Sequence, residues 1–146
     1  PYTYSHSNVN QSYSHYFQSL AHPLGSNFNE TLFLIDYKFH QFKAHLQFTN
    51  IKFGDKIRND PHNYGNDIFV SSDERPFDYG VKMYQGNYSV LDYIKTHISY
   101  IINPKTNLIL QTGMVYRLLE NDSGSEETSF IFFGVKSDLF NRYYDY

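Results

Sequence analysis

The sequence predicts an all-β fold, an antiparallel up-and-down meander, and two observations carry that prediction. Aromatic residues make up 19% of the 146 residues, as 15 Tyr and 13 Phe without Trp, although the mean hydropathy is polar at -0.56. Ring side chains favour pleated surfaces, and from Glu30 onward apolar and polar residues alternate, as in strands with one apolar face. This composition fits two classes of β-protein: a soluble sandwich or ligand-binding barrel, and a transmembrane barrel with aromatic girdles and a polar lumen.

Five segments show the alternation, and we expect each to form a strand. In the first segment, Phe33 and Ile35 lie on one face, whereas Asp36 and Lys38 lie on the other. The third and fourth segments are joined by a short stretch with Pro104, whose fixed φ angle favours a tight turn. The predicted strands are 31–39, 42–53, 90–102, 108–119 and 128–140.

The length predicts one domain at most, and we expect a single partial domain over residues 1–146. Its parts are an irregular lead-in over 1–29, the five strands within 30–140 and a tail over 141–146. The chain starts at Pro1 without a hydrophobic signal region, which predicts a processed protein or a fragment.

The links between the predicted strands alternate between short and long. The links after the first and third strands are short, whereas 54–89 and 120–127, after the second and fourth, are long or very polar. Outer-membrane barrels alternate short periplasmic turns with longer outer loops, and strands of roughly 9 to 13 residues suit a tilted bilayer crossing. Five strands cannot close a barrel, whose usual minimum is about eight. We therefore expect the C-terminal part of an outer-membrane β-barrel, with a soluble antiparallel meander as the alternative.

We expect one face of the strands to contact lipid and the other to line a polar lumen. The predicted lumen face carries Lys43, His45, Lys95, His97 and Arg117, either as ordinary lining or as a cationic track for an acidic glycan. The predicted lipid face comprises Phe33, Ile35, Leu46, Phe48, Ile98, Tyr100, Leu110, Met114, Ile131 and Phe133.

The first candidate binding region is SHYFQSLAHPLGSNFNE, residues 14–30. The spacing of its histidines matches no compact metal-ligand pattern, so we predict no metal site. We expect mainly an architectural role, in which amides and imidazoles satisfy buried polar groups. Contact with a sugar is the second interpretation, because these side chains bind hydroxyls and aromatic rings stack on sugar faces. The ligand-binding residues predicted here are His15, His22, Asn27 and Glu30.

The second candidate is the long loop over residues 53–89. Loops longer than about 12 to 15 residues are usually functional or disordered. Its tyrosines lie among acidic and basic residues, a composition suited to polar recognition, and Tyr64, Tyr79 and Tyr84 are its predicted ligand-binding residues. We expect a short extra hairpin over 67–70 and 81–84, and no EF-hand pattern is present.

Several other classes of protein are disfavoured. The chain has no Cys, which excludes disulfides and thiolate metal sites. A net charge of -3 supplies no broad cationic field for nucleic acid, and no run of about 18 apolar residues could form a transmembrane helix. There is no G-x-S-x-G motif, and DSGS at residues 122–125 consists of ordinary turn formers. We therefore predict a protein that is not an enzyme and has no cofactor or nucleic-acid partner.

Three stretches of the chain resemble a known family: PYTYSHS at residues 1–7, SLAHPLGSNFNE at 19–30 and FFGVKSDLFNRYYDY at 132–146. They are similar to the C-terminal half of outer-membrane β-barrels of Bacteroidetes, gliding-motility proteins of the RemB type that are distantly similar to the Wzi-type capsule-assembly family. The resemblance spans most of the chain, and AHPLG-N--E is its most specific part. The ending departs from a simple barrel-assembly signal, because Arg142 falls on the same parity as Tyr144 and Tyr146.

This resemblance implies a location in the bacterial outer membrane. It also implies a role in cell-surface assembly, gliding motility or capsule and exopolysaccharide organisation. The expected partners are outer-membrane lipid, surface polysaccharide and other secretion or motility proteins.

Two rival hypotheses stay open. The main rival is a soluble, secreted carbohydrate-binding β-sandwich or barrel, which predicts that the chain folds alone in water. The second is a barrel hydrolase, which predicts that replacing a single His or Ser abolishes turnover.

Overall fold

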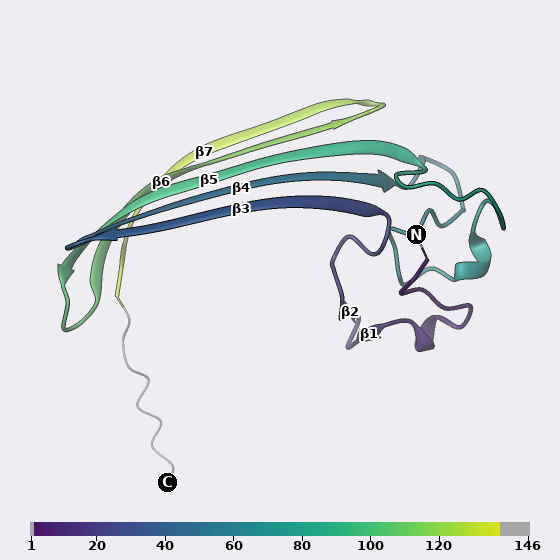
Figure 1. The fold of residues 1–146 in the computed structure, drawn as a ribbon, viewed down its shortest axis with the longest axis horizontal. Helices are drawn as coiled ribbons and strands as arrows, with labels where there is room; N and C mark the ends of the chain where they lie inside the picture. The colour runs from purple at the N-terminus through teal and green to yellow at the C-terminus, as the bar shows by residue number, and fades with distance from the viewer. Residues whose placement is uncertain (1, 138–146) are drawn as a thin grey trace, which may run out of the picture. The chain divides into compact units, whose positions relative to one another are not determined.

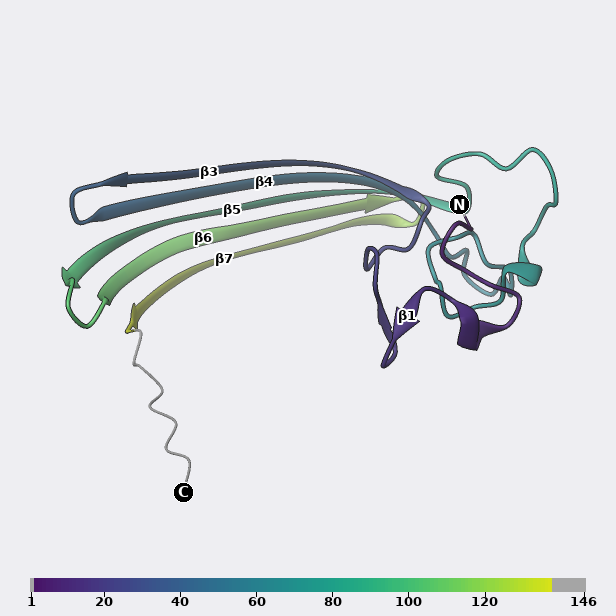
Figure 2. The same cartoon turned by 60° about the horizontal axis from the view of Figure 1, so that its bottom comes forward.

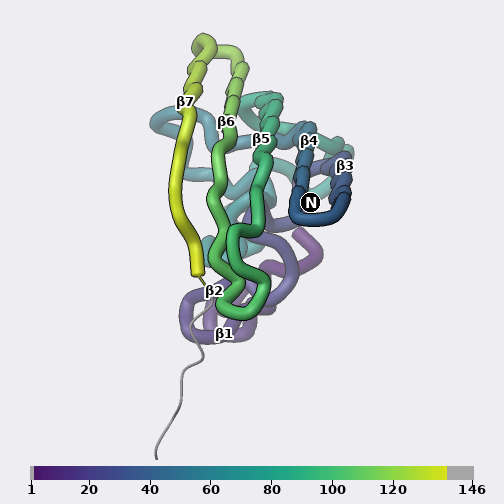
Figure 3. Tube along the Cα trace, turned by 90° about the vertical axis from the view of Figure 1, so that its left-hand side faces the viewer, coloured from purple at the N-terminus to yellow at the C-terminus, as the bar shows by residue number. Residues whose placement is uncertain are grey.

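The structure, a computed structural model, describes residues 2–137, and within them every regular element is a strand or a short 3-10 helix. Five strands form one antiparallel sheet in the order β3-β4-β5-β6-β7, each beside its successor in the chain (Figure 1, Figure 3). A separate sheet pairs β1 with β2. The all-β antiparallel meander predicted from the sequence is confirmed. The elements are η1 (Val9–Gln11), β1 (Ser14–His15), β2 (Gln18–Ser19), β3 (Phe28–Phe39), β4 (Phe42–Asp55), η2 (Ser72–Glu74), β5 (Asn87–Asn103), β6 (Leu108–Asn121) and β7 (Gly124–Lys136).

The strands extend beyond their predicted limits into stretches where most side chains are polar. β3 begins at Phe28 and not at Thr31, and β5 begins at Asn87 and not at Val90. Backbone pairing continues there although polarity no longer alternates, so the sequence pattern fades before the strand ends. β7 ends at Lys136, and the residues from 138 onward, including the predicted tail, lie outside the described residues.

The link between β6 and β7 is a tight turn, so the polar loop predicted over 120–127 is wrong. Only Asp122 and Ser123 lie between the two strands. The Asn121 side chain accepts a hydrogen bond from the backbone N–H of Ser123 at 2.8 Å, and Gly124 takes a φ of 146°. An Asn-centred turn followed by glycine closes a hairpin without a loop. The alternation of short and long links therefore fails at this connection.

The segment between β4 and β5, residues 56–86, contains no strand, so the extra hairpin predicted over 67–70 and 81–84 is wrong. Its side chains bond to nearby backbone instead. For example, the Asp67 carboxylate accepts from the N–H of Phe69 at 2.8 Å. Such local bonds compete with a β-ladder for the same backbone groups.

The chain divides into two compact units. Unit 1 contains the two-stranded sheet, both 3-10 helices and the segment 56–86, together with the adjoining ends of the long strands. Unit 2 contains the remaining length of the five strands, which bend together along their course (Figure 2). Among the described residues, unit 1 comprises 2–31, 50–92 and 118–126, and unit 2 comprises 32–49, 93–117 and 127–137.

Large apolar side chains gather on one face of the sheet in unit 2. Phe33 stacks against Phe48 with ring centroids 6.3 Å apart, and Phe42 contacts Tyr100 at 5.0 Å. Eight of the ten residues predicted to contact lipid are exposed, from Tyr100 at 38% to Ile131 at 80%. The surface named here the apolar face consists of Phe33, Ile35, Leu46, Phe48, Ile98, Tyr100, Leu110, Met114, Ile131 and Phe133.

The opposite face of unit 2 carries charged side chains. The buried side chains of this unit lie on the same face. His45 lies there beside Asp36 and His97. Burial in this unit is confined to the middle strands β4, β5 and β6, which have a neighbouring strand on each side. The buried residues of this face are Thr49, Ser99, Ile101, Ile109 and Val115.

β3 and β7 are the edges of the sheet in the described residues. Every residue of β3 after Phe28 is exposed, including Leu32 and Leu34 on the opposite face. β7 is exposed along nearly its whole length, and Phe130 is 52% exposed. Neither strand contains Pro, and both run for 12 or 13 residues.

Candidate functional site

Asn27, a predicted ligand-binding residue, is fully buried inside unit 1. Its side-chain amide nitrogen donates to the carbonyl oxygens of Gln85 at 2.9 Å and Gly54 at 3.4 Å. Its side-chain oxygen accepts from the backbone N–H of Tyr84 at 2.7 Å. Both amide hydrogens are therefore used within the protein, and the side chain joins the start of β3 to the end of β4 and the approach to β5.

His22 and Glu30 form a pair at the start of β3. The backbone N–H of Leu24 donates to Nδ1 of His22 at 3.2 Å, so Nε2 carries the proton that is shared with Glu30 at 3.1 Å. The ring also stacks on Phe28 with centroids 4.2 Å apart. Both ring nitrogens are thus occupied, and the arrangement matches the architectural role expected for this segment.

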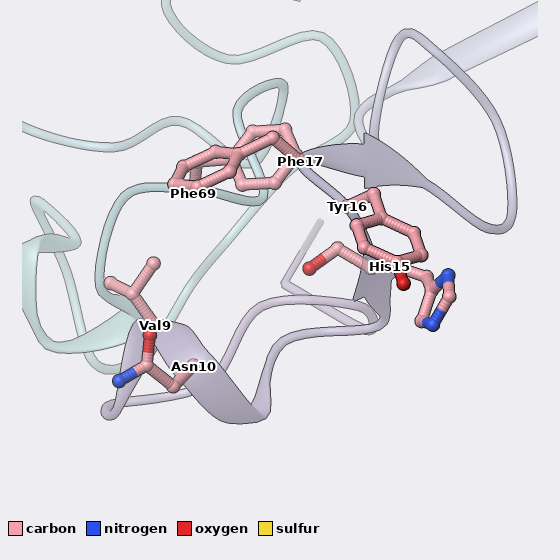
Figure 4. Close-up of a pocket in the computed structure, with 7 residues that line it drawn as sticks. Val9, Asn10, His15, Tyr16, Phe17 and Phe69 are labelled. Atoms are coloured by element: carbon pink, nitrogen blue, oxygen red, sulfur yellow. The ribbon is translucent and has the colours of Figure 1, made fainter.

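His15 lies on a hairpin whose tip presents two aromatic residues. Tyr16 and Phe17, between β1 and β2, have φ angles of 49° and 57° and are each 89% exposed. Phe17 stacks on Phe69 with centroids 5.8 Å apart, whereas the rings of His15 and Tyr16 lie on the other side of the tip (Figure 4). These residues line a cavity of about 360 Å³ together with Val9, Asn10 and Ser14.

Tyr64 is a buried residue held by a carboxylate. Its hydroxyl donates to Oδ2 of Asp60 at 2.5 Å, and the backbone N–H of His62 donates to Oδ1 of the same residue at 3.0 Å. These hydrogen bonds, that of Tyr64 first, lower the pKa of Asp60 to about 2. The bond to Asp60, followed by burial, raises the pKa of Tyr64 to about 12. The tyrosine therefore stays neutral and its hydroxyl is already engaged.

The two remaining predicted residues differ in exposure. Tyr79 is 91% exposed, so its ring is open to a ligand. Tyr84 is half-buried and contacts Tyr88 edge to face at 5.8 Å. The structure therefore leaves the predicted residues His15 and Tyr79 freely accessible. It uses four others in internal bonds: Asn27, His22, Glu30 and Tyr64.

The opposite face of unit 2 holds a cluster of Asp36, His45 and His97, which the sequence predicted only in part. Nδ1 of His45 lies 2.6 Å from Oδ1 of Asp36, and its ring stacks on that of His97 at 4.7 Å. Both histidines were predicted on this face, but the pairing with Asp36 was not. Counting outward from the turn at His40 and Gln41 places residues 36 and 45 opposite each other, so the signal was present.

A metal centre or a catalytic arrangement needs convergent side chains. Among residues 2–137, no three His, Asp or Glu side chains gather where they could hold a metal ion. In the DSGS stretch, Asp122 and Ser123 form the β6–β7 turn, and Ser125 lies in β7. No helix in the described part of the chain is long and apolar enough to cross a membrane.

Comparison with known proteins leaves the chain without an assigned relative. No protein-family model, no curated protein and no solved structure matches it. Evidence on function therefore comes from the two faces of unit 2 and from the hydrogen bonds within unit 1.

Proposed function

We propose that the chain is the C-terminal part of a β-barrel in the bacterial outer membrane, and that its apolar face contacts lipid. The observation that carries the proposal is the exposure of that face. Soluble monomers rarely expose large contiguous apolar patches, and such patches mark contact with a partner or a membrane. Here the exposed apolar residues extend over all five strands, including Phe33 at 60% and Phe133 at 72%.

The dimensions of unit 2 support a bilayer as the partner. The portions of the strands within this unit are about 8 to 11 residues long, and a tilted strand crosses the hydrocarbon core in about 9 to 11 residues. The first residues of unit 1 next to these portions include a polar pair, in which Asn50 donates to Asp92 at 2.7 Å.

The two edges support a larger sheet. Natural proteins protect edge strands with charges, Pro, bulges or short length, because unpaired backbone recruits other chains. The long apolar strand β3 has few such devices, with Asp36 and Lys38 as its charged residues after Thr31. Within a bilayer every backbone group must be paired, which only a closed barrel achieves for strands. We infer that strands beyond those described here cover β3 and β7.

The biological role follows the family resemblance of the sequence. We place the protein among non-enzymatic surface proteins that act in cell-surface assembly, gliding motility or capsule and exopolysaccharide organisation. Accessible aromatic side chains such as Tyr16 and Tyr79 are suited to stacking on sugar rings. Surface polysaccharide and other secretion or motility proteins are the partners this role would require.

Membrane fractionation tests the location. The protein as the cell makes it should sediment with the outer membrane, resist washing with alkaline carbonate and dissolve only in detergent. A known soluble periplasmic protein and a known barrel, followed in the same fractions, calibrate the result. Release into the soluble fraction would contradict the proposal and favour the soluble carbohydrate-binding alternative.

A further inference from the structure

Asp36, His45 and His97 form a compact polar cluster on the opposite face of unit 2. The Asp36–His45 contact of 2.6 Å fixes the orientation of one imidazole, and the second ring stacks on it with an interplanar angle of 26°. The three residues come from β3, β4 and β5, which are neighbours in the sheet. The carboxylate contacts one imidazole, and the second imidazole stacks on the first.

Lysine side chains surround this cluster and outnumber its carboxylate. Lys38 and Lys43 line the same cavity, which has a volume of about 180 Å³. Lys95 from β5 and Lys136 from β7 lie close enough to His97 for their charges to act on it. The whole chain has a net charge of -3, so this concentration of cations is local to the face. Clustered charge of one sign raises the local concentration of ions of the other sign.

His97 adds a polar atom without a partner. Its Nδ1 is buried and makes no hydrogen bond to any described residue. Buried polar atoms are nearly always bonded to protein, water or ligand. Gly113 lies beside the base of this side chain: an added Cβ there would come within 2.6 Å of the His97 Cβ and 2.7 Å of the Phe132 ring. The surroundings of the His97 Cβ are therefore tightly packed.

We propose that this cluster binds an oxyanion group, the chemistry shared by phosphates, sulfates and carboxylates. Lysine supplies compact positive charges for such a group, and charge-assisted hydrogen bonds to it are stronger than neutral ones. His45 places Nδ1 against Asp36 and therefore directs Nε2, at the other end of the ring, away from it. The buried Ser99 lies on the same face and also lines the cavity. The site lies within unit 2, so its argument does not depend on the membrane.

Calorimetric titration of the full-length protein in a neutral detergent tests the site. The probes are inorganic pyrophosphate, citrate and, as a neutral compound, maltose, each at low ionic strength. We expect saturable binding of pyrophosphate, citrate or both, no heat of binding from maltose, and weakening by added salt. Binding of one anion alone assigns the site to phosphate or to carboxylate ligands.

Charge variants separate this cluster from general attraction. The double variant Lys43→Gln, Lys95→Gln should bind about tenfold more weakly, because two charge-assisted contacts are lost. Asp36→Asn should bind more tightly, because it removes the negative charge of the carboxylate that lines the cavity. Lys105→Gln, in the exposed turn between β5 and β6, is the matched control and should bind like the natural protein.

Two results would overturn the site. One is the absence of saturable binding of both anions to the natural protein. The other is an equal loss in Lys105→Gln and in the double variant, which would indicate only diffuse charge. Binding measured in detergent does not depend on where the protein resides in the cell, so this failure is distinguishable from failure of the membrane proposal.

Discussion

Asn27 bonds to groups that lie 27 to 58 residues away along the chain, and only an uncharged amide can satisfy all of them. An aspartate could accept from the Tyr84 N–H but could not donate to two carbonyl oxygens. Gly25, with a φ of 68°, forms a bend two residues before Asn27. An added Cβ at Gly25 would lie 2.5 Å from the Asn66 carbonyl oxygen, so a larger residue would clash there. The most motif-like stretch of the sequence thus serves to start β3.

Replacing Asn27 with Ala should destabilise the protein by about 1–3 kcal/mol, because the Tyr84 N–H and the carbonyls of Gln85 and Gly54 would lose their bonds to this buried amide. Chemical unfolding of the purified protein measures this loss. Asn29→Ala, two residues further along β3 and exposed, is the matched control and should leave stability nearly unchanged. Equal losses for the two variants would show that the buried bonds contribute little.

The Tyr64–Asp60 pair should make stability depend on pH at both extremes. The pKa of Asp60 falls from 3.8 to about 2, so its contribution is full above pH 3.8 and is lost as the pH falls toward 2. The pKa of Tyr64 rises from 10 to about 12, so its contribution is full below pH 10 and is lost as the pH rises toward 12. Tyr64→Phe should weaken both the acid and the alkaline dependence, as followed by unfolding across a pH series. Tyr79→Phe, at an exposed ring, should retain the natural profile.

At the scale of elements, the period of two located every strand of the larger sheet, because each crosses unit 2 with one apolar face. The period of two did not predict the strand ends or the β6–β7 turn. Most residues there are polar, so polarity does not alternate although the backbone remains paired. The Asp36–His45 pair was predictable from the short turn between β3 and β4. The bonds of Asn27 were not, because no local pattern brings Gln85 to it.

The assignment of β6 side chains to the apolar face or the opposite face can be tested by placing one charge on each face in turn. Met114→Arg puts a cation on the apolar face and should cost about 2–4 kcal/mol if that residue lies mid-bilayer. Gln111→Arg puts the same charge on the opposite face and should be far milder. Unfolding of each variant in a lipid environment, together with its yield in the outer membrane, measures the difference. Equal damage at the two positions would contradict the assignment of faces.

At the scale of the whole chain, the distribution of polar and apolar residues over the two sheet faces is the reverse of that in a soluble protein built on one sheet. Such a protein buries its apolar face and leaves charged residues in water, with one face packed on a core. Here Ile109 and Val115 are buried on the face that also carries lysines and histidines, whereas the aromatic face is open. In the proposed barrel, lipid on one side and a polar, cation-lined interior on the other would account for both observations together.

Residues 1–146 produced alone should therefore not form a stable monomer in water. Without further strands, β3 and β7 keep unpaired backbone along 12 and 13 residues, and the apolar face has no lipid; both features promote aggregation. We expect residues 1–146 to be insoluble in water. In detergent, heating should not change their electrophoretic mobility, whereas it should change that of the full-length protein, which forms a closed barrel in our proposal. Size-exclusion chromatography and circular dichroism in water provide the decisive contrast. A monomer with strand-type dichroism and cooperative unfolding would mean that the two edges need no partner, and the soluble carbohydrate-binding module would then replace the barrel.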